Sequence, residues 1–121
     1  MISPEKARRI AKVWIDSWNS HDLDSILSHY SEDVELTSPI VIKLLGQESG
    51  TVRGKDALRG YFEKGLAAYP DLRFEMLEVF AGVGGIVLYY KRHNGPSGAE
   101  MMVLNGEDKI EKVIAHYAQA K

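Results

Sequence analysis

The carboxyl group best placed to do chemistry in this sequence is that of Glu100, which opens the apolar run Glu100–Leu104. Alternation along a strand would put Glu100 and Met102 on one face. A carboxyl group that faces an apolar cavity has a raised pKa and can act as an acid or a base. The alternative is a solvated carboxylate near a strand end, or one paired across a hairpin with Lys91 or Arg92.

A second candidate group lies on the preceding strand, where Tyr89 and Lys91 share one face. If that face is the inner one, a phenol and an ammonium group meet Glu100 and could bind a carboxylate or a carbonyl group. A register that differs by one residue would instead turn Tyr90 and Arg92 inward. We expect the first arrangement, with Tyr89 and Lys91 in the site.

Aromatic residues recur at positions expected to face inward, where they either line a cavity or fill the core. A pocket lined by such rings suits a flat or ring-shaped apolar ligand. The expected ligand-binding residues, besides Tyr89 and Lys91, are Trp14, Trp18, Tyr30, Ser38, Phe62, Met102 and Tyr117.

The remaining motifs indicate neither a metal site nor a cofactor site. None of the four histidines has a metal-ligand spacing with another candidate ligand. They are His21, His29, His93 and His116. The glycine cluster 82–85 leads into a strand rather than a helix, so we interpret it as a turn and not as a phosphate-binding loop.

Length, charge and cysteine content limit the class of protein. The 121 residues predict one domain that spans positions 1–121. The net charge of −2, without runs of lysine or arginine, argues against nucleic-acid binding. No apolar run approaches the roughly 20 residues that cross a bilayer, and the start lacks the apolar core of a signal peptide. The chain has no cysteine, so we expect no disulfide and a cytoplasmic location.

Helical patterns fill the first half of the sequence. The first helix begins at Ser3-Pro4-Glu5, which supplies a cap, a proline suited to the first turn and a favourable negative charge. Asp22 can cap a second helix that carries Tyr30 on its apolar face. A third helix is expected from about Lys55 to Ala68. The apolar segment Val41–Leu45 is either a short helical turn or irregular.

Strand patterns fill the second half. After a first strand around 34–38, we expect strands over 72–80, 86–93, 99–104 and 109–118, separated by glycine-rich turns. Helices come first and strands last, without βαβ alternation. The order predicts an α+β domain whose helices pack on one face of a curved sheet.

Four motifs in this order resemble the nuclear transport factor 2-like superfamily, in particular its SnoaL-like branch. They are WNSHDLD from Trp18, YSEDVE from Tyr30, GKDALRGYF from Gly54 and DKI from Asp108. The resemblance covers nearly the whole chain. It implies a cone of cystatin-like topology: three N-terminal helices on a strongly curved, mostly antiparallel sheet, open at one end to a small-molecule pocket that Glu100 faces.

Members of this superfamily include steroid isomerases, polyketide cyclases and epoxide hydrolases, so the fold does not fix the reaction. In ketosteroid isomerase a carboxylate base precedes the proline after the first strand, and a tyrosine and a protonated aspartate form the oxyanion hole. The matching positions here are Ser38, Trp14 and Glu100. Serine is no base without a partner and indole donates only an N–H group, so we do not expect steroid isomerase activity.

We therefore expect a small-molecule binding domain with an apolar, aromatic-lined pocket. The alternative is an isomerase, cyclase or hydrolase that acts on a small cyclic or ketone substrate with Glu100 as acid or base. A protein-interaction module is a third possibility, against which the lack of a partner-specific motif counts.

The outer face of the sheet is expected to carry apolar side chains as well. We place Ile86, Leu88, Ile114 and His116 on that face. Exposed apolar surface of this kind is costly in a monomer. The resemblance implies a homodimer that forms through this convex surface.

Overall fold

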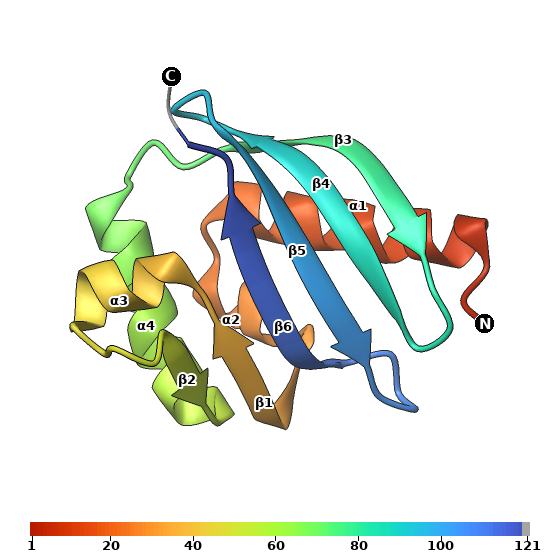
Figure 1. Ribbon diagram of the computed structural model, residues 1–121, viewed down its shortest axis with the longest axis horizontal. Coiled ribbons are helices and arrows are strands. Elements are labelled where there is room, and N and C mark those ends of the chain that lie inside the picture. Colours follow the sequence, from red (N-terminus) through yellow and green to blue (C-terminus); the bar gives the residue numbers. More distant parts are fainter. Residues whose placement is uncertain (120–121) are drawn as a thin grey trace.

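The computed structural model describes residues 1–119, which form four helices and six strands (Figure 1). The helices are α1 (Pro4–Ser20), α2 (Leu23–Leu27), α3 (Pro39–Leu45) and α4 (Lys55–Ala68). The strands are β1 (Tyr30–Thr37), β2 (Thr51–Arg53), β3 (Phe74–Ala81), β4 (Gly85–Arg92), β5 (Ser97–Leu104) and β6 (Ile110–Tyr117).

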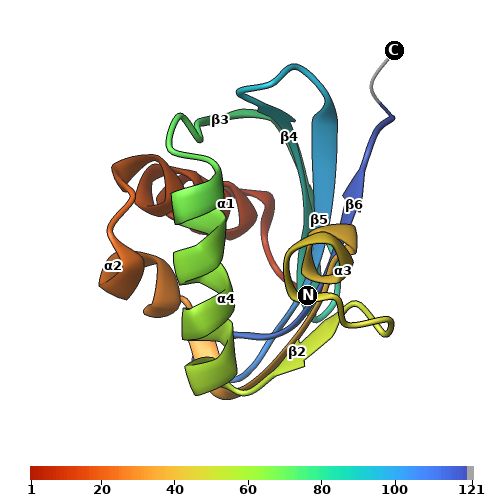
Figure 2. The same cartoon turned by 90° about the vertical axis from the view of Figure 1, so that its left-hand side faces the viewer.

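All the strands belong to one sheet of order β2-β1-β6-β5-β4-β3. The strands β1 and β6 are parallel, and the other neighbours are antiparallel. Figure 2 shows α1, α2 and α4 together on one side of the bent sheet. This arrangement confirms the α+β class, with helices packed on one face of a curved, mostly antiparallel sheet.

Local sequence explains where α1 begins and ends. The Ser3 hydroxyl accepts a hydrogen bond from the Lys6 backbone N–H at 3.1 Å, and Pro4 occupies the first turn, where its missing N–H costs nothing. His21 adopts a left-handed conformation with φ of 60° and closes the helix by donating its N–H to the Trp18 carbonyl. The buried face includes both tryptophans of the chain, Trp14 and Trp18.

The second helix is shorter than the sequence pattern predicted. Asp22 caps α2 as expected, but the helix ends at Leu27, and Tyr30 is the first residue of β1. The pairing between β1 and β6 explains the difference, because the His29 carbonyl accepts the Ile110 backbone N–H at 2.8 Å. Tyr30 is nevertheless buried, because strand β1 directs its side chain into the same core that the expected helix would have faced.

The segment between β1 and α4 holds a helix and a strand. Ser38 caps α3, with its hydroxyl 3.1 Å from the Ile40 backbone N–H, and Gly46 ends this helix at φ of 68°. The sequence left the α3 segment open between a helical turn and irregular structure. It gave no sign of β2, whose three residues pair with the end of β1.

The register between β4 and β5 decides which side chains face the helices. Leu88 lies opposite Glu100 and Ile86 opposite Met102, and all four side chains are buried on the inner face. The expectation that Ile86 and Leu88 lie on the outer face was wrong. Every residue from Ile86 to Tyr90 is apolar or aromatic, so the sequence alone gives no alternation from which to read the face.

Candidate functional site

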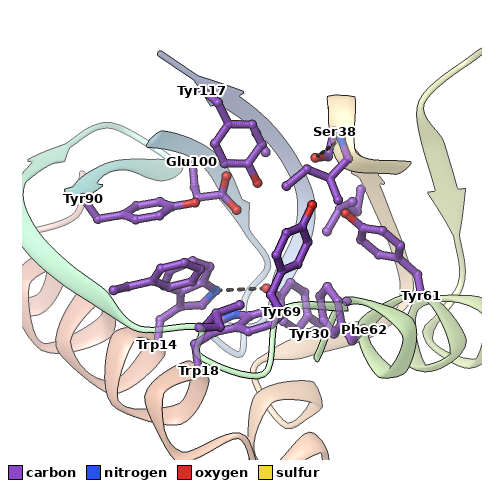
Figure 3. A pocket seen from close by; sticks show the side chains of 16 residues that line it. Trp14, Trp18, Tyr30, Ser38, Tyr61, Phe62, Tyr69, Tyr90, Glu100 and Tyr117 are labelled. Carbon is purple, nitrogen blue, oxygen red and sulfur yellow. Dashed lines mark hydrogen bonds between the residues drawn. The ribbon is translucent and has the colours of Figure 1, made fainter. Parts of the chain in front are cut away.

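A cavity of about 70 Å³ lies between the helices and the inner face of the sheet (Figure 3). Sixteen residues line it, and nine of these are aromatic. The aromatic residues are Trp14, Trp18, Tyr30, Tyr61, Phe62, Tyr69, Phe74, Tyr90 and Tyr117. By volume the cavity holds about five water molecules or a small ligand.

Glu100 is the one acidic residue of this lining, and its side chain is 5% exposed. Figure 3 shows its carboxyl group lying between Tyr90 and Tyr117. Within residues 1–119 its Oε2 atom has no hydrogen-bond partner. Burial raises the pKa of the Glu100 carboxyl group to about 8, while the positive charge of Arg92 opposes this rise. At neutral pH the group is therefore mostly protonated and can donate a hydrogen bond into the cavity.

The position of Glu100 follows from strand pairing. It lies opposite Leu88 of β4 and Ala115 of β6, so neighbouring strands flank it on both sides. Two residues earlier, Gly98 makes room for the rings beside the carboxyl group, since an added Cβ would lie 3.0 Å from both Tyr90 and Tyr117.

The two tryptophans have different roles in the cavity wall. The Trp14 indole N–H donates to the Tyr30 hydroxyl at 2.9 Å, and the Trp14 ring stacks on Phe74 with 5.7 Å between centroids. The Trp18 indole nitrogen is buried without an acceptor in the described part of the chain. Trp18 therefore offers the cavity an unused donor, and a buried donor without a partner is costly.

Phenol and serine hydroxyls supply the other polar groups of the cavity. Burial raises the pKa of Tyr30, Tyr61, Tyr90 and Tyr117, and the nearby Glu100 charge raises each further. Hydrogen bonding to Ser38 partly offsets the rise for Tyr61 and Tyr117. All four phenols are therefore neutral at physiological pH and able to donate.

Most of the residues predicted for the site do line the cavity. They are Trp14, Trp18, Tyr30, Ser38, Phe62 and Tyr117, together with Glu100. Met102 is buried on the same face of the sheet but lies outside the lining.

Tyr89 and Lys91 are a correction, because both are exposed on the outer face and only Tyr90 of this strand lines the cavity. Lys91 lies opposite Ser97, not opposite Glu100. The one-residue alternative weighed for β4 is the one that the structure adopts.

Four aromatic residues of the lining were not predicted. Tyr61 lay on the apolar side of the third expected helix and could have been found there, and Tyr90 was named only in the alternative register. Tyr69 was counted on the same apolar side as Tyr61, and Phe74 alternates with Arg73 and Glu75 along its expected strand, so a periodic signal could have found these two as well. Phe74 is positioned by Asn19, whose side chain bonds its backbone N–H at 2.7 Å and its carbonyl at 2.9 Å.

A second hollow of about 220 Å³ lies on another side of Trp14, beside Arg9, Val13, His29 and Asp108. It is larger, but two of its polar groups, His29 and Asp108, are already engaged. The His29 Nε2 atom lies 2.7 Å from the Ser17 hydroxyl, and Lys6 pairs with Asp108 at 2.9 Å. The cavity beside Glu100 has unpaired buried polar groups, so we consider it the stronger site.

Two further structural findings concern the described residues. Among residues 1–119 no three histidine, aspartate or glutamate side chains gather closely enough to hold a metal ion. No helix in this part of the chain has the length and hydropathy needed to span a membrane.

Comparison with solved structures gives close matches over nearly the whole chain. A SnoaL-like protein of unknown function from Burkholderia thailandensis is 36% identical, with a TM-score of 0.93 and coverage of 98% of both chains. A protein with a cystatin-like fold from Methylobium petroleophilum is 13% identical, with a TM-score of 0.75 over 99% of this chain and 80% of that one.

SalBIII, an epoxide hydrolase/cyclase-like enzyme of pyran ring formation in salinomycin, is 17% identical. Its TM-score is 0.75, over 98% of this chain and 95% of its own.

No curated protein sequence matches the chain. The family model for the SnoaL-like domain matches residues 11–109. The resemblance seen in the sequence is thereby confirmed, and the chain belongs to the SnoaL-like domain family.

Proposed function

We propose that this chain is a small-molecule binding protein whose ligand occupies the aromatic cavity beside Glu100. One observation carries the proposal: a buried carboxyl group faces this cavity with an oxygen that no described residue satisfies. Buried polar groups in folded proteins are nearly always hydrogen-bonded, so an unpaired one beside a hollow is a sign of a missing partner. Membership of the SnoaL-like family supports the same conclusion.

The chemistry of the cavity defines the kind of ligand contact. Aromatic rings supply most of the wall and favour a flat apolar body. The protonated Glu100 carboxyl group and the Trp18 indole N–H both donate, and they suit a ligand oxygen such as that of a carbonyl group. Their burial strengthens such hydrogen bonds, because water does not compete for them.

A calorimetric titration with small cyclic ketones tests the proposal. We expect Glu100→Gln to bind within about tenfold of the wild type, since an amide keeps a donor at this place. We expect Glu100→Leu to bind about tenfold more weakly than Glu100→Gln, the value of one hydrogen bond. Equal affinities in all three proteins would contradict a ligand at this site.

A second candidate function is catalysis of an isomerase, cyclase or hydrolase type, with Glu100 as acid or base. The pKa of about 8 favours it, because an acid–base group works best when its pKa lies near the operating pH. The structural likeness to SalBIII is consistent with this class. Glu100→Gln would then abolish turnover of a cyclic substrate while its affinity stays within about tenfold. Turnover that survives in this variant would refute the role.

We propose a homodimer that forms through the outer face of the sheet. Four large apolar or aromatic side chains are exposed there: Phe80 at 56%, Met101 at 44%, Tyr89 at 40% and Val103 at 38%. Their strands are neighbours in the sheet, so these side chains form one apolar surface that a second copy would cover.

We also propose that residues 1–121 act as one domain and that the protein is cytoplasmic. Limited proteolysis tests the first statement, since one domain should resist cleavage between α4 and β3. Cell fractionation tests the second.

A further inference from the structure

Two cationic side chains lie against aromatic rings of the cavity wall. The guanidinium carbon of Arg92 lies 4.2 Å from the centroid of the Tyr117 ring. The Lys43 ammonium group lies 5.6 Å from the centroid of the Tyr69 ring and donates to its hydroxyl at 3.2 Å. Tyr69 and Tyr117 both line the cavity, so positive charge reaches its wall from α3 and from the end of β4.

A smaller hollow of about 40 Å³ marks this place as the rim of the cavity. Five of its eight lining residues also line the cavity beside Glu100, and the remaining three are Arg92, His93 and Asn94. The His93 ring packs edge-on against Tyr69, with 6.2 Å between centroids. We call Arg92, which lines this hollow, and Lys43, which reaches its wall through Tyr69, the cationic rim.

No described acidic residue neutralises this rim. The five ion pairs found within residues 1–119 include neither Arg92 nor Lys43. The nearest acid in the cavity, Glu100, is kept mostly protonated at neutral pH by its burial. The guanidinium group of Arg92 is half-buried and packs on the Tyr117 ring, and no carboxylate of the described residues pairs with it. It can therefore pair with the carboxylate of a ligand.

We propose that the ligand is a small monocarboxylic acid with one apolar ring, its carboxylate bound by Arg92 and Lys43 at the cationic rim and its ring inside the aromatic cavity. This inference rests on the proposed function and adds to it the chemical class and the orientation of the ligand. Volumes of about 70 and 40 Å³ limit the ligand to at most a single ring with a short polar group.

An opposite class of ligand has to be considered. Aromatic cages also bind ammonium ions, and an ionised Glu100 would supply a counter-charge. The positive charges of Arg92 and Lys43 beside the cavity wall would repel such a ligand. The two classes therefore predict opposite responses when charge is removed from the rim.

Calorimetry with three compounds of matched size tests the inference: benzoate, acetophenone and benzylamine. We expect the wild type to bind benzoate about tenfold more tightly than acetophenone, because a charge-assisted hydrogen bond is stronger than a neutral one. Arg92→Gln should weaken benzoate binding about tenfold and leave acetophenone within about threefold. Lys91→Gln is the matched control, since it removes the same charge from the exposed outer face of the same strand.

Further measurements separate failure of the inference from failure of the pocket. Arg92→Lys keeps the charge without the planar fork and should lose only about threefold in benzoate affinity, so it serves if Arg92→Gln does not fold. Salt at about 0.5 M should weaken the binding of benzoate more than that of acetophenone.

Three outcomes would overturn the inference and leave the pocket standing. They are equal affinity for benzoate and acetophenone, equal effects of Arg92→Gln and Lys91→Gln, and a preference for benzylamine. If none of the compounds binds, the proposed function fails as well.

Discussion

At the scale of single residues, the pKa of Glu100 links the site to the stability of the protein. The folded pKa of about 8 exceeds the ordinary value of 4.5, so between these values the folded state holds a proton that the unfolded state has lost. The contribution of Glu100 to the free energy of unfolding must therefore fall as the pH rises from about 4.5 to 8 and level off above 8. Each pH unit in that window lowers this contribution by about 1.4 kcal/mol.

We predict that Glu100→Gln removes this slope and stabilises the protein above pH 8 by several kcal/mol, at about 1.4 kcal/mol per pH unit of the shift. Urea unfolding at several pH values measures the free energy of unfolding of both proteins, and Glu75→Gln on the exposed side of β3 is the control. The four tyrosines around the carboxyl group stay neutral in this window, because burial raises their pKa values. His29 contributes in both proteins, because burial and Lys109 lower its pKa. Parallel profiles of wild type and Glu100→Gln would show that the carboxyl group is solvated.

At the scale of secondary-structure elements, the cavity depends on how β5 lets aromatic rings approach it. We predict that Gly98→Ala destabilises the protein by about 2 kcal/mol, because its Cβ would press on Tyr90 and Tyr117 at 3.0 Å. Ligand affinity should fall too, since these rings would move into the cavity. Gly84→Ala is the control, as an added Cβ there meets no atom within 4 Å. Urea unfolding that gives equal stabilities for both variants would contradict the packing described at Gly98.

The start of β3 depends on α1 through the side chain of Asn19. This side chain makes two hydrogen bonds to the Phe74 backbone, and His21 reaches the Leu72 carbonyl at 2.7 Å. We predict that Asn19→Ala lowers the free energy of unfolding by about 2 kcal/mol and loosens the part of the cavity wall formed by Phe74. Hydrogen exchange of the Phe74 amide should rise selectively, whereas Asn94→Ala in the exposed hairpin should leave it unchanged. Unaltered exchange at Phe74 would refute this coupling.

The elements were predictable from sequence to different degrees. The third expected helix matches α4 at both ends, because helical periodicity and a following proline mark it. The inner face of β5 was also correct, since Glu100 and Met102 share it. The face of β4 was not predictable, because its apolar run from Ile86 to Tyr90 fits either register until its partner strand fixes it. The strand β2 is too short for a pattern to appear.

At the scale of the whole molecule, the exposed outer face predicts assembly. We expect light scattering after size exclusion to show a dimer, and Met101→Lys to shift it to a monomer, since a charge in the centre of an apolar interface is costly. Val83→Lys is the control, because Val83 is 83% exposed in the turn between β3 and β4. A monomeric wild type, or a Met101→Lys variant that stays dimeric, would refute this interface.

The central claim is that a small molecule enters the cavity beside Glu100, and the indole N–H signals test it most directly. The chain has two tryptophans, so a ¹⁵N spectrum shows two such signals, which Trp14→Phe and Trp18→Phe assign. Trp14 already donates to Tyr30, whereas Trp18 has no acceptor in the described chain. Titration with acetophenone should shift the Trp18 signal strongly, because its carbonyl oxygen can accept this N–H, and the Trp14 signal weakly. If acetophenone binds by calorimetry and the Trp18 signal does not move, its carbonyl group lies elsewhere and the account is wrong.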